Sequence, residues 1–155
     1  SKPTVTVGNK TYRAQTVLFD PQLALAVLKV PGLAADPLRF DTTLDQGDSA
    51  VILGFPENGP FQAGAARIRG RIILRGPDIF GKGRVERDVY SLRGDVRPGN
   101  SGGPLISPRG EVAGVIFAAS ISDPDTGYAV TAREALPVAT AGSKANDAVP
   151  TGTCA

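Results

Sequence analysis

The heptapeptide Gly99–Leu105 constrains this chain more than any other stretch. It places the hydroxyl of Ser101 between glycines, and Pro104 and an aliphatic run follow. Glycine adopts positive φ angles that other residues resist, so the backbone can fold tightly around a single side chain. Such a turn can expose the hydroxyl and direct consecutive N–H groups into one concavity that suits an oxyanion. A glycine-rich β-turn with a solvated serine is the simpler alternative.

Short runs of apolar and β-branched residues, interrupted by glycine and proline, make up most of the chain. The 155 residues include 19 glycines and 13 prolines, and 41% are apolar, which favours many short strands around a packed core. We expect strands at 4–7, 11–19, 23–30, 50–55, 62–74, 85–92, 104–107, 111–118 and 128–131. The apolar run 23–30 is typical of a strand buried on both faces. The pattern predicts an all-β chain with a Greek-key β-barrel.

One helix is expected near the C-terminus, over residues 132–141. Thr131 precedes it and Glu134 stands three residues later, which is the spacing of a capping box. Pro137 lies inside this stretch and is expected to shorten the helix. The residues from 142 onward are small and polar, and we expect them to be extended.

Charge and hydropathy give limited information on partners. The formal net charge of +2 argues neither for nor against nucleic acid, and we expect no nucleic-acid partner. Arg67, Arg69 and Arg71 alternate, which predicts one solvated face of a strand, with a phosphate track as the alternative. No apolar run approaches the ~20 residues that span a bilayer, so a membrane contact would need an anchor upstream. We expect neither a cofactor nor a metal.

The residues Gly-Asn-Ser-Gly-Gly-Pro at 99–104 resemble the nucleophile loop of the trypsin-like (chymotrypsin-fold) serine proteases. The resemblance implies a chymotrypsin-like double Greek-key β-barrel whose first barrel is incomplete in this chain. Residues 1–56 would be the remainder of that N-terminal barrel, and residues 57–155 the C-terminal barrel, helix and tail. Ser101 would be the nucleophile, and the N–H groups of Gly99 and Ser101 would form the oxyanion hole.

A serine hydroxyl is a weak nucleophile unless a base and an orienting acid activate it. The run 20–28 resembles the family's aspartate motif, but Ala24 occupies the position of the catalytic aspartate. Asp20 belongs to a different part of that motif and is a weak substitute. The chain contains no histidine, and the family's histidine segment would lie upstream of residue 1. We therefore expect the chain alone to be inactive.

Five further segments resemble the mycobacterial acid-resistance periplasmic serine proteases and their actinobacterial relatives. They lie at 54–56, 76–81, 87–90, 126–128 and 152–155. Members of this group carry N-terminal membrane helices before an extracytoplasmic protease domain. The resemblance therefore implies a periplasmic location and a membrane tether in the full-length protein. It also implies a disulfide between Cys154, the single cysteine, and an upstream cysteine, so one upstream segment would supply both the histidine and the second cysteine.

The same resemblance implies where a peptide or protein substrate would bind. Asp95 lies six residues before Ser101, where a buried carboxylate would form the floor of the primary pocket and favour Arg or Lys. An aspartate that lies on the surface or anchors a loop is an equally weighted alternative for this residue. The segment Phe117, Ala118 and Ala119 is expected to pair with the substrate backbone and add the peptide as an extra strand. Phe117 fits the core as well as a pocket wall.

Three functional hypotheses remain. The leading one is a serine endopeptidase domain that lacks its histidine and has alanine at the acid position. The alternative is a pseudoprotease that binds peptides, and an upstream histidine segment would separate these two. A β-barrel interaction domain unrelated to proteases would leave the serine loop and the aspartate motif unexplained. Because the upstream strands are missing, residues 5–53 would present unpaired edges. We expect either a second peptide that completes the barrel or a disordered or rearranged N-terminal half.

Overall fold

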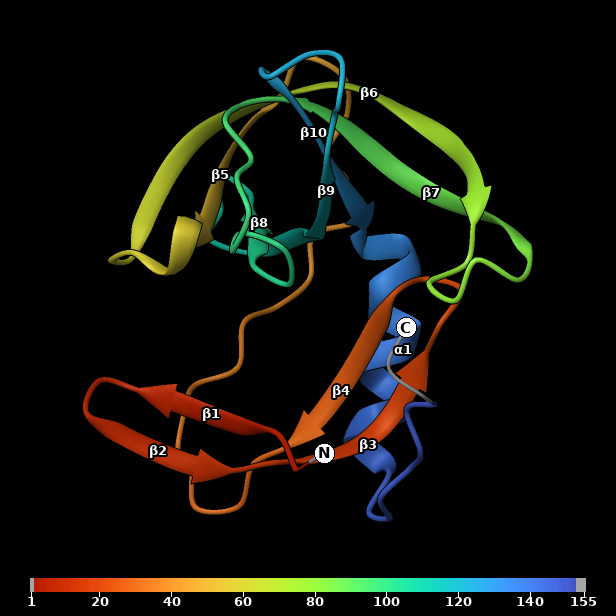
Figure 1. Ribbon diagram of the computed structural model, residues 1–155. Coiled ribbons are helices and arrows are strands. Elements are labelled where there is room, and N and C mark those ends of the chain that lie inside the picture. Colours follow the sequence, from red (N-terminus) through yellow and green to blue (C-terminus); the bar gives the residue numbers. More distant parts are fainter. Residues whose placement is uncertain (1, 153–155) are drawn as a thin grey trace.

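The structure, a computed structural model, describes residues 2–152. Figure 1 shows a barrel above, two hairpins below, and a helix that runs from the barrel to the second hairpin. The hairpins contain β1 (Thr4–Val7), β2 (Lys10–Arg13), β3 (Gln15–Asp20) and β4 (Leu25–Lys29). The barrel contains β5 (Ser49–Gly54), β6 (Gln62–Pro77), β7 (Arg84–Arg93), β8 (Pro104–Ile106), β9 (Val112–Ala119) and β10 (Thr126–Thr131). A single 3-10 turn (Pro56–Asn58) follows β5, and helix α1 (Ala132–Lys144) follows β10.

The barrel strands are antiparallel and close in the order β10-β7-β6-β5-β8-β9. Their inward side chains form the hydrophobic core, in which Leu92, Leu105 and Ile116 are completely buried. Because β5 pairs with both β6 and β8, the barrel begins at Ser49. The boundary at residue 56 suggested by the sequence would separate β5 from the two strands that it pairs with.

The N-terminal strands form two separate two-stranded sheets, β1–β2 and β3–β4. The run 11–19 predicted one strand, but the chain divides at Ala14, whose N–H donates to the carbonyl of Pro3 at 2.9 Å. As a result, β2 pairs with β1 and β3 pairs with β4. Within residues 2–152 neither hairpin pairs with a further strand, so this part is an incomplete barrel.

The prediction that 23–30 is buried on both faces was wrong. Ala26, Leu28 and Lys29 are exposed, and no residue of β4 is fully buried. Within the described residues β4 pairs with β3 alone, and α1 packs against this hairpin. Helix packing requires Gly142, because a Cβ there would lie 2.5 Å from Cγ2 of Val27.

Helix α1 begins after Thr131 but lacks the predicted capping box. The Thr131 hydroxyl is buried and makes no hydrogen bond within the described part of the chain. Glu134 instead accepts a hydrogen bond from the backbone N–H of Asp88 on β7 at 3.3 Å. The helix continues through Pro137 to Lys144, beyond the predicted end at residue 141.

The residues after α1 run back along the hairpin β3–β4, as an extended tail would. The N–H of Val149 donates to the carbonyl of Thr16 at 2.9 Å, and Lys29 donates to the side chain of Asn146 at 2.7 Å. These contacts attach the C-terminal end of the chain to its N-terminal region. Within residues 2–152, no helix has both the length and the apolar character that crossing a membrane requires.

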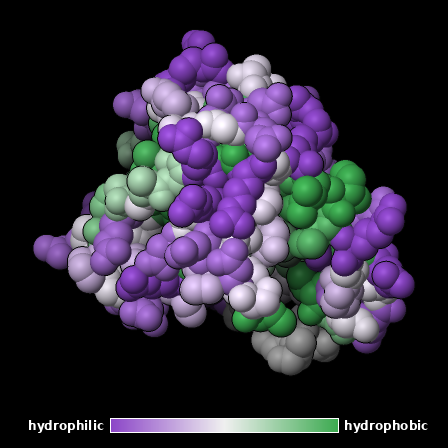
Figure 2. Space-filling model, turned by 90° about the horizontal axis from the view of Figure 1, so that it is seen from above, coloured by the Kyte–Doolittle hydropathy of each residue, from purple (hydrophilic) through white to green (hydrophobic). Residues whose placement is uncertain are grey.

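Figure 2 shows that the outer surface seen from above is largely hydrophilic, with an apolar patch on the right. The alternating arginines of β6 contribute to this hydrophilic surface. Arg69 pairs with Asp123 at 3.3 Å, and Arg71 makes a two-pronged contact with Asp88. Arg67 donates to a backbone carbonyl of the turn before β5 at 2.8 Å. These arginines support the barrel surface, which agrees with the prediction of a solvated face.

Candidate functional site

The serine loop lies between β7 and β8, and its glycines are required by its shape. Gly99 has φ of +95° and Gly102 has φ of +85°, in the region that favours glycine. A Cβ at Gly99 would lie 2.5 Å from the carbonyl oxygen of Phe55, and a Cβ at Gly103 would overlap the carbonyl oxygen of Leu53. The end of β5 therefore sits directly against the loop, and the tight turn predicted from the sequence is present.

The opposite side of the loop is attached to β9. The N–H of Gly102 donates to the carbonyl of Ile116 at 2.7 Å, and the N–H of Ile116 donates to the carbonyl of Gly103 at 2.9 Å. Within the loop, Gly103 donates to the carbonyl of Asn100 at 2.9 Å. Contacts with β5 and β9, the two strands on either side of β8, thus fix the backbone around Ser101.

The Ser101 side chain is exposed, and its Oγ donates a long hydrogen bond to the carbonyl of Phe117 at 3.4 Å. The backbone N–H groups of Gly99 and Ser101 donate to no acceptor among the hydrogen bonds of residues 2–152. Backbone N–H groups without an acceptor in the same loop as an exposed hydroxyl can stabilise an oxyanion that forms there. The loop thus brings together the residues predicted for the nucleophile and the oxyanion hole.

The segment Phe117–Ala119 lies at the end of β9 and has one paired edge. Ala118 is opposite Tyr128 and Ala119 is opposite Gly127 on β10. The pairing of β9 with β8 ends at Val115, so within residues 2–152 the other edge of 117–119 faces the serine loop without a strand partner. A bulge leaves Phe117 without a register partner on β10, and such irregularities often re-aim residues beside a site.

The turn between β3 and β4 carries the two residues considered for the catalytic acid. Asp20 is used locally, because its Oδ1 accepts the N–H groups of Gln22 at 2.9 Å and Leu23 at 3.0 Å. Ala24 is exposed and has φ of +58°. Aspartate and asparagine tolerate this left-handed conformation better than alanine does. The backbone at position 24 would therefore accommodate an aspartate better than it does alanine.

Arg87 on β7 connects this turn to Phe117 on β9, and it was not among the residues predicted from the sequence. The side chain is buried, with only 7% of its surface exposed. Its Nε donates to the carbonyl of Gln22 at 2.6 Å, and its guanidinium carbon lies 5.8 Å from the centre of the Phe117 ring. The available signal was the strand period of two, which places Arg87 on the same face as Val85 and Val89.

Asp95 does not lie at the base of a buried pocket. Its side chain is 60% exposed and pairs with Arg97 at 2.6 Å. Of the two alternatives weighed for this residue, the structure corresponds to the surface aspartate. Its role in substrate selection remains a prediction, as do the roles of the other site residues. Cys154 lies outside the described residues.

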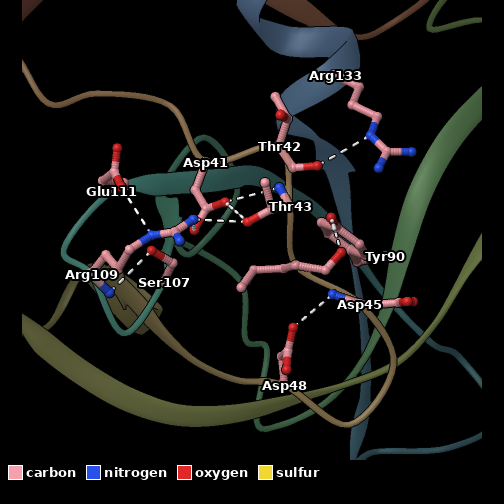
Figure 3. Close-up of polar contacts among 11 residues, drawn as sticks. Asp41, Thr42, Thr43, Asp45, Asp48, Tyr90, Ser107, Arg109, Glu111 and Arg133 are labelled. Atoms are coloured by element: carbon pink, nitrogen blue, oxygen red, sulfur yellow. Dashed lines mark hydrogen bonds and ion pairs between the residues drawn. The ribbon is translucent and has the colours of Figure 1, made fainter.

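A second polar cluster, drawn in Figure 3, anchors the connection between the hairpins and the barrel. Asp41 is 2% exposed and pairs with Arg109 at 2.7 Å. Burial alone would raise the pKa of Asp41. Hydrogen bonds with the Thr43 side chain and N–H, and with the side chains of Ser107 and Arg109, outweigh burial and lower the pKa to about 2. The Asp41 N–H also donates to the carbonyl of Val112 on β9 at 2.8 Å. This carboxylate therefore stays ionised and holds the connection against the barrel.

Side chains that commonly bind metal ions do not cluster in the described part of the chain. Within residues 2–152, no group of three or more His, Cys, Asp or Glu side chains is arranged to hold a metal ion.

Comparison with known proteins places this geometry in a family. Residues 2–115 match the trypsin-like peptidase domain. The serine protease Rv3671c of Mycobacterium tuberculosis is 47% identical over 133 residues, which cover 84% of this chain and 34% of that protein. A probable periplasmic serine endoprotease, DegP-like, of Chlamydia trachomatis is 32% identical over 108 residues, or 67% of this chain and 20% of that protein. The chain thus spans about a third or less of the length of these relatives.

Solved structures agree with the sequence matches. The active form of the Rv3671c protease superposes with a TM-score of 0.94 and 44% identity, covering 99% of this chain and 68% of that one. An inactive form of the same protease gives a TM-score of 0.80 at 45% identity, covering 89% of this chain and 71% of that one. The HtrA-type protease AlgW with a decapeptide gives 0.73 at 25% identity, covering 87% and 42%. The chain belongs to the trypsin-like peptidase domain family.

Proposed function

We propose that this chain carries the nucleophile, oxyanion hole and substrate strand of a serine endopeptidase, and that hydrolysis needs a histidine from another segment of the parent protein. The observation that carries this proposal is the exposed Ser101 hydroxyl in a tight loop where the N–H groups of Gly99 and Ser101 have no acceptor within residues 2–152. In the reaction, the Ser101 oxygen would attack the scissile carbonyl carbon and lose its proton to the base. The carbonyl oxygen would then gain negative charge next to these two N–H groups.

The substrate would be a peptide that adds to β9 along residues 117–119. The support for this position is the edge beyond Val115, which has no strand partner within the described residues. Strand addition supplies affinity through main-chain hydrogen bonds and leaves side-chain pockets to supply selectivity. Asp95 would favour a basic substrate residue only weakly, because Arg97 already pairs with its exposed carboxylate.

Two parts of the catalytic machinery are missing from this chain. It contains no histidine, and Ala24 cannot orient a base. The parent protein would supply the histidine and a cysteine partner for Cys154 from an upstream segment, and would hold the domain outside the cytoplasm through an anchor. The chain alone would bind peptides without cleaving them. Ala24 also favours the alternative, a pseudoprotease that retains the groove and has lost the chemistry.

Reconstitution separates these two functions. The chain is combined with the upstream segment of its own parent protein, with Ala24 retained or with Ala24→Asp, and hydrolysis of a labelled peptide is measured. We expect Ala24→Asp to raise the rate by roughly 10⁴-fold, because loss of the orienting aspartate costs about that much in complete triads. Ser101→Ala should abolish this gain. Peptide binding without hydrolysis in every combination would establish the pseudoprotease.

A further inference from the structure

The serine loop has two different flanks. On one side it is bonded to β9, which presents backbone N–H and C=O groups to a peptide. On the other side it contacts the end of β5 and the turn that follows, where a Cβ at Gly99 would meet the carbonyl oxygen of Phe55. A peptide that pairs with 117–119 and reaches Ser101 must continue across this second flank. That half of the peptide is the part that leaves as the amine product when the scissile C–N bond breaks and the acyl-enzyme forms.

The second flank carries two exposed aromatic rings. Phe55 is 58% exposed and Phe61 is 56% exposed. Their ring centres lie 5.7 Å apart with an angle of 65° between planes, an edge-to-face arrangement. An aromatic pair that is exposed beside a site is an apolar surface available to a ligand. We call this pair the Phe55–Phe61 platform.

The turn that holds the platform is fixed in a strained conformation. Glu57 and Asn58 both have positive φ, +55° and +58°, which is unfavourable for glutamate in particular. The N–H of Glu57 donates to the carbonyl of Pro98, next to Gly99, at 2.6 Å. Strain of this kind persists where surrounding contacts enforce it, and it concentrates at ligand-binding sites. The platform is therefore held at a constant position relative to the oxyanion donors.

We infer that the Phe55–Phe61 platform binds apolar side chains of the substrate residues that follow the scissile bond. This inference rests on the proposed function, because it assigns the leaving half of the same peptide. The β9 flank binds the peptide backbone through hydrogen bonds, whereas the platform distinguishes peptides by the apolarity of their side chains. A peptide with large apolar residues after the scissile bond covers both rings, and a polar or glycine-containing peptide leaves them in water.

The test uses the 155-residue chain, labelled with ¹⁵N, and two short peptides with the same N-terminal half. After the residue whose carbonyl carbon Ser101 would attack, one peptide continues with Phe-Leu and the other with Ser-Gly. Binding is measured from shifts of backbone amide signals, since the chain is not expected to cleave either peptide. We expect the Phe-Leu peptide to bind on the order of tenfold more tightly, the effect of partly burying one or two aromatic rings.

Variants locate the effect on the platform. Phe55→Ser and Phe61→Ser should remove the preference for Phe-Leu, and both should fold because the two side chains are more than half exposed. Ile73→Ser is the matched control, since Ile73 is 54% exposed on β6 and should leave the preference intact. Equal affinity of the two peptides, with amide shifts at 117–119, would overturn the platform and leave the proposed function standing. Absence of shifts at both 99–103 and 117–119 would overturn the two together.

Discussion

The barrel and the N-terminal hairpins are built from similar strands but reach different degrees of burial. In the barrel every strand has two neighbours, and side chains such as Leu105 and Ile116 are completely buried. In the hairpins each strand has one neighbour within the described residues, and Leu28 remains 39% exposed. The difference teaches that closure, more than strand composition, decides how much apolar surface this chain removes from water. The serine loop belongs to the closed part.

The largest expected effect contrasts one leucine from each region. Leu105→Ala should lower the free energy of unfolding by about 3 kcal/mol or more, because it leaves a cavity in a closed core. Leu28→Ala should cost under about 1 kcal/mol, because the side chain already contacts water. Urea unfolding of both variants measures the difference. Equal losses would mean that the hairpin is as well packed as the barrel.

The burial contrast explains which parts of the fold were predictable. The strand runs and the serine loop follow from local alternation and from glycine, which act over a few residues. The burial of 23–30 was mispredicted because it depends on neighbouring strands, which no local pattern contains. The capping box at Thr131 failed for the same reason, since Glu134 contacts β7 instead.

The candidate site divides in the same way. Ser101 and its glycines could be proposed from the sequence alone, as could the position of Ala24. The burial of Arg87, its contact with Gln22 and the aromatic pair at Phe55 result from packing between distant segments. The strand period of two places Arg87 on the face of Val85 and Val89, but no local pattern indicates which distant residues Arg87 and Phe55 contact.

The next largest effect concerns the loop and its support by β5. Gly103→Ala should destabilise the protein by about 2–3 kcal/mol, because the new Cβ would overlap the Leu53 carbonyl oxygen and force the backbone apart. Gly64→Ala, on exposed β6, is the control, since a Cβ there meets nothing within 4 Å. Thermal unfolding compares them. A tolerated Gly103→Ala would show that the loop is not clamped by β5.

The connection between the regions gives an effect of intermediate size that depends on pH. The pKa of Asp41 is about 2 in the folded protein against an ordinary value of 3.8. Because the pKa is lower in the folded state, ionisation of Asp41 stabilises the fold above about pH 4. This stabilisation is lost as the pH falls toward 2. The wild-type protein should therefore exceed Asp41→Asn in stability by about 2 kcal/mol near pH 6 through this ionisation. Chemical unfolding across pH 2–6 should show the difference shrinking with acid, whereas a constant difference would argue against it.

The smallest effect tests how firmly the tail holds the hairpin. Asn146→Ala removes the exposed hydrogen bond from Lys29 and should cost about 0.5 kcal/mol or less. Asn146→Asp keeps an acceptor and adds charge, so its stability should equal or exceed that of the wild type. Urea unfolding at low salt measures both. A loss of several kcal/mol in Asn146→Ala would mean that the tail is a main support of the N-terminal region.

Hydrogen exchange of individual amides tests the central claim most directly, that the serine loop is a preformed part of the closed barrel. The N–H groups of Gly102, Gly103 and Ile116 bond the loop together and to β9. We predict that they exchange only through global unfolding, together with the barrel core, whereas amides of β3 and β4 exchange through local opening. Exchange of Gly102 and Ile116 as fast as that of β3 and β4 would contradict the account.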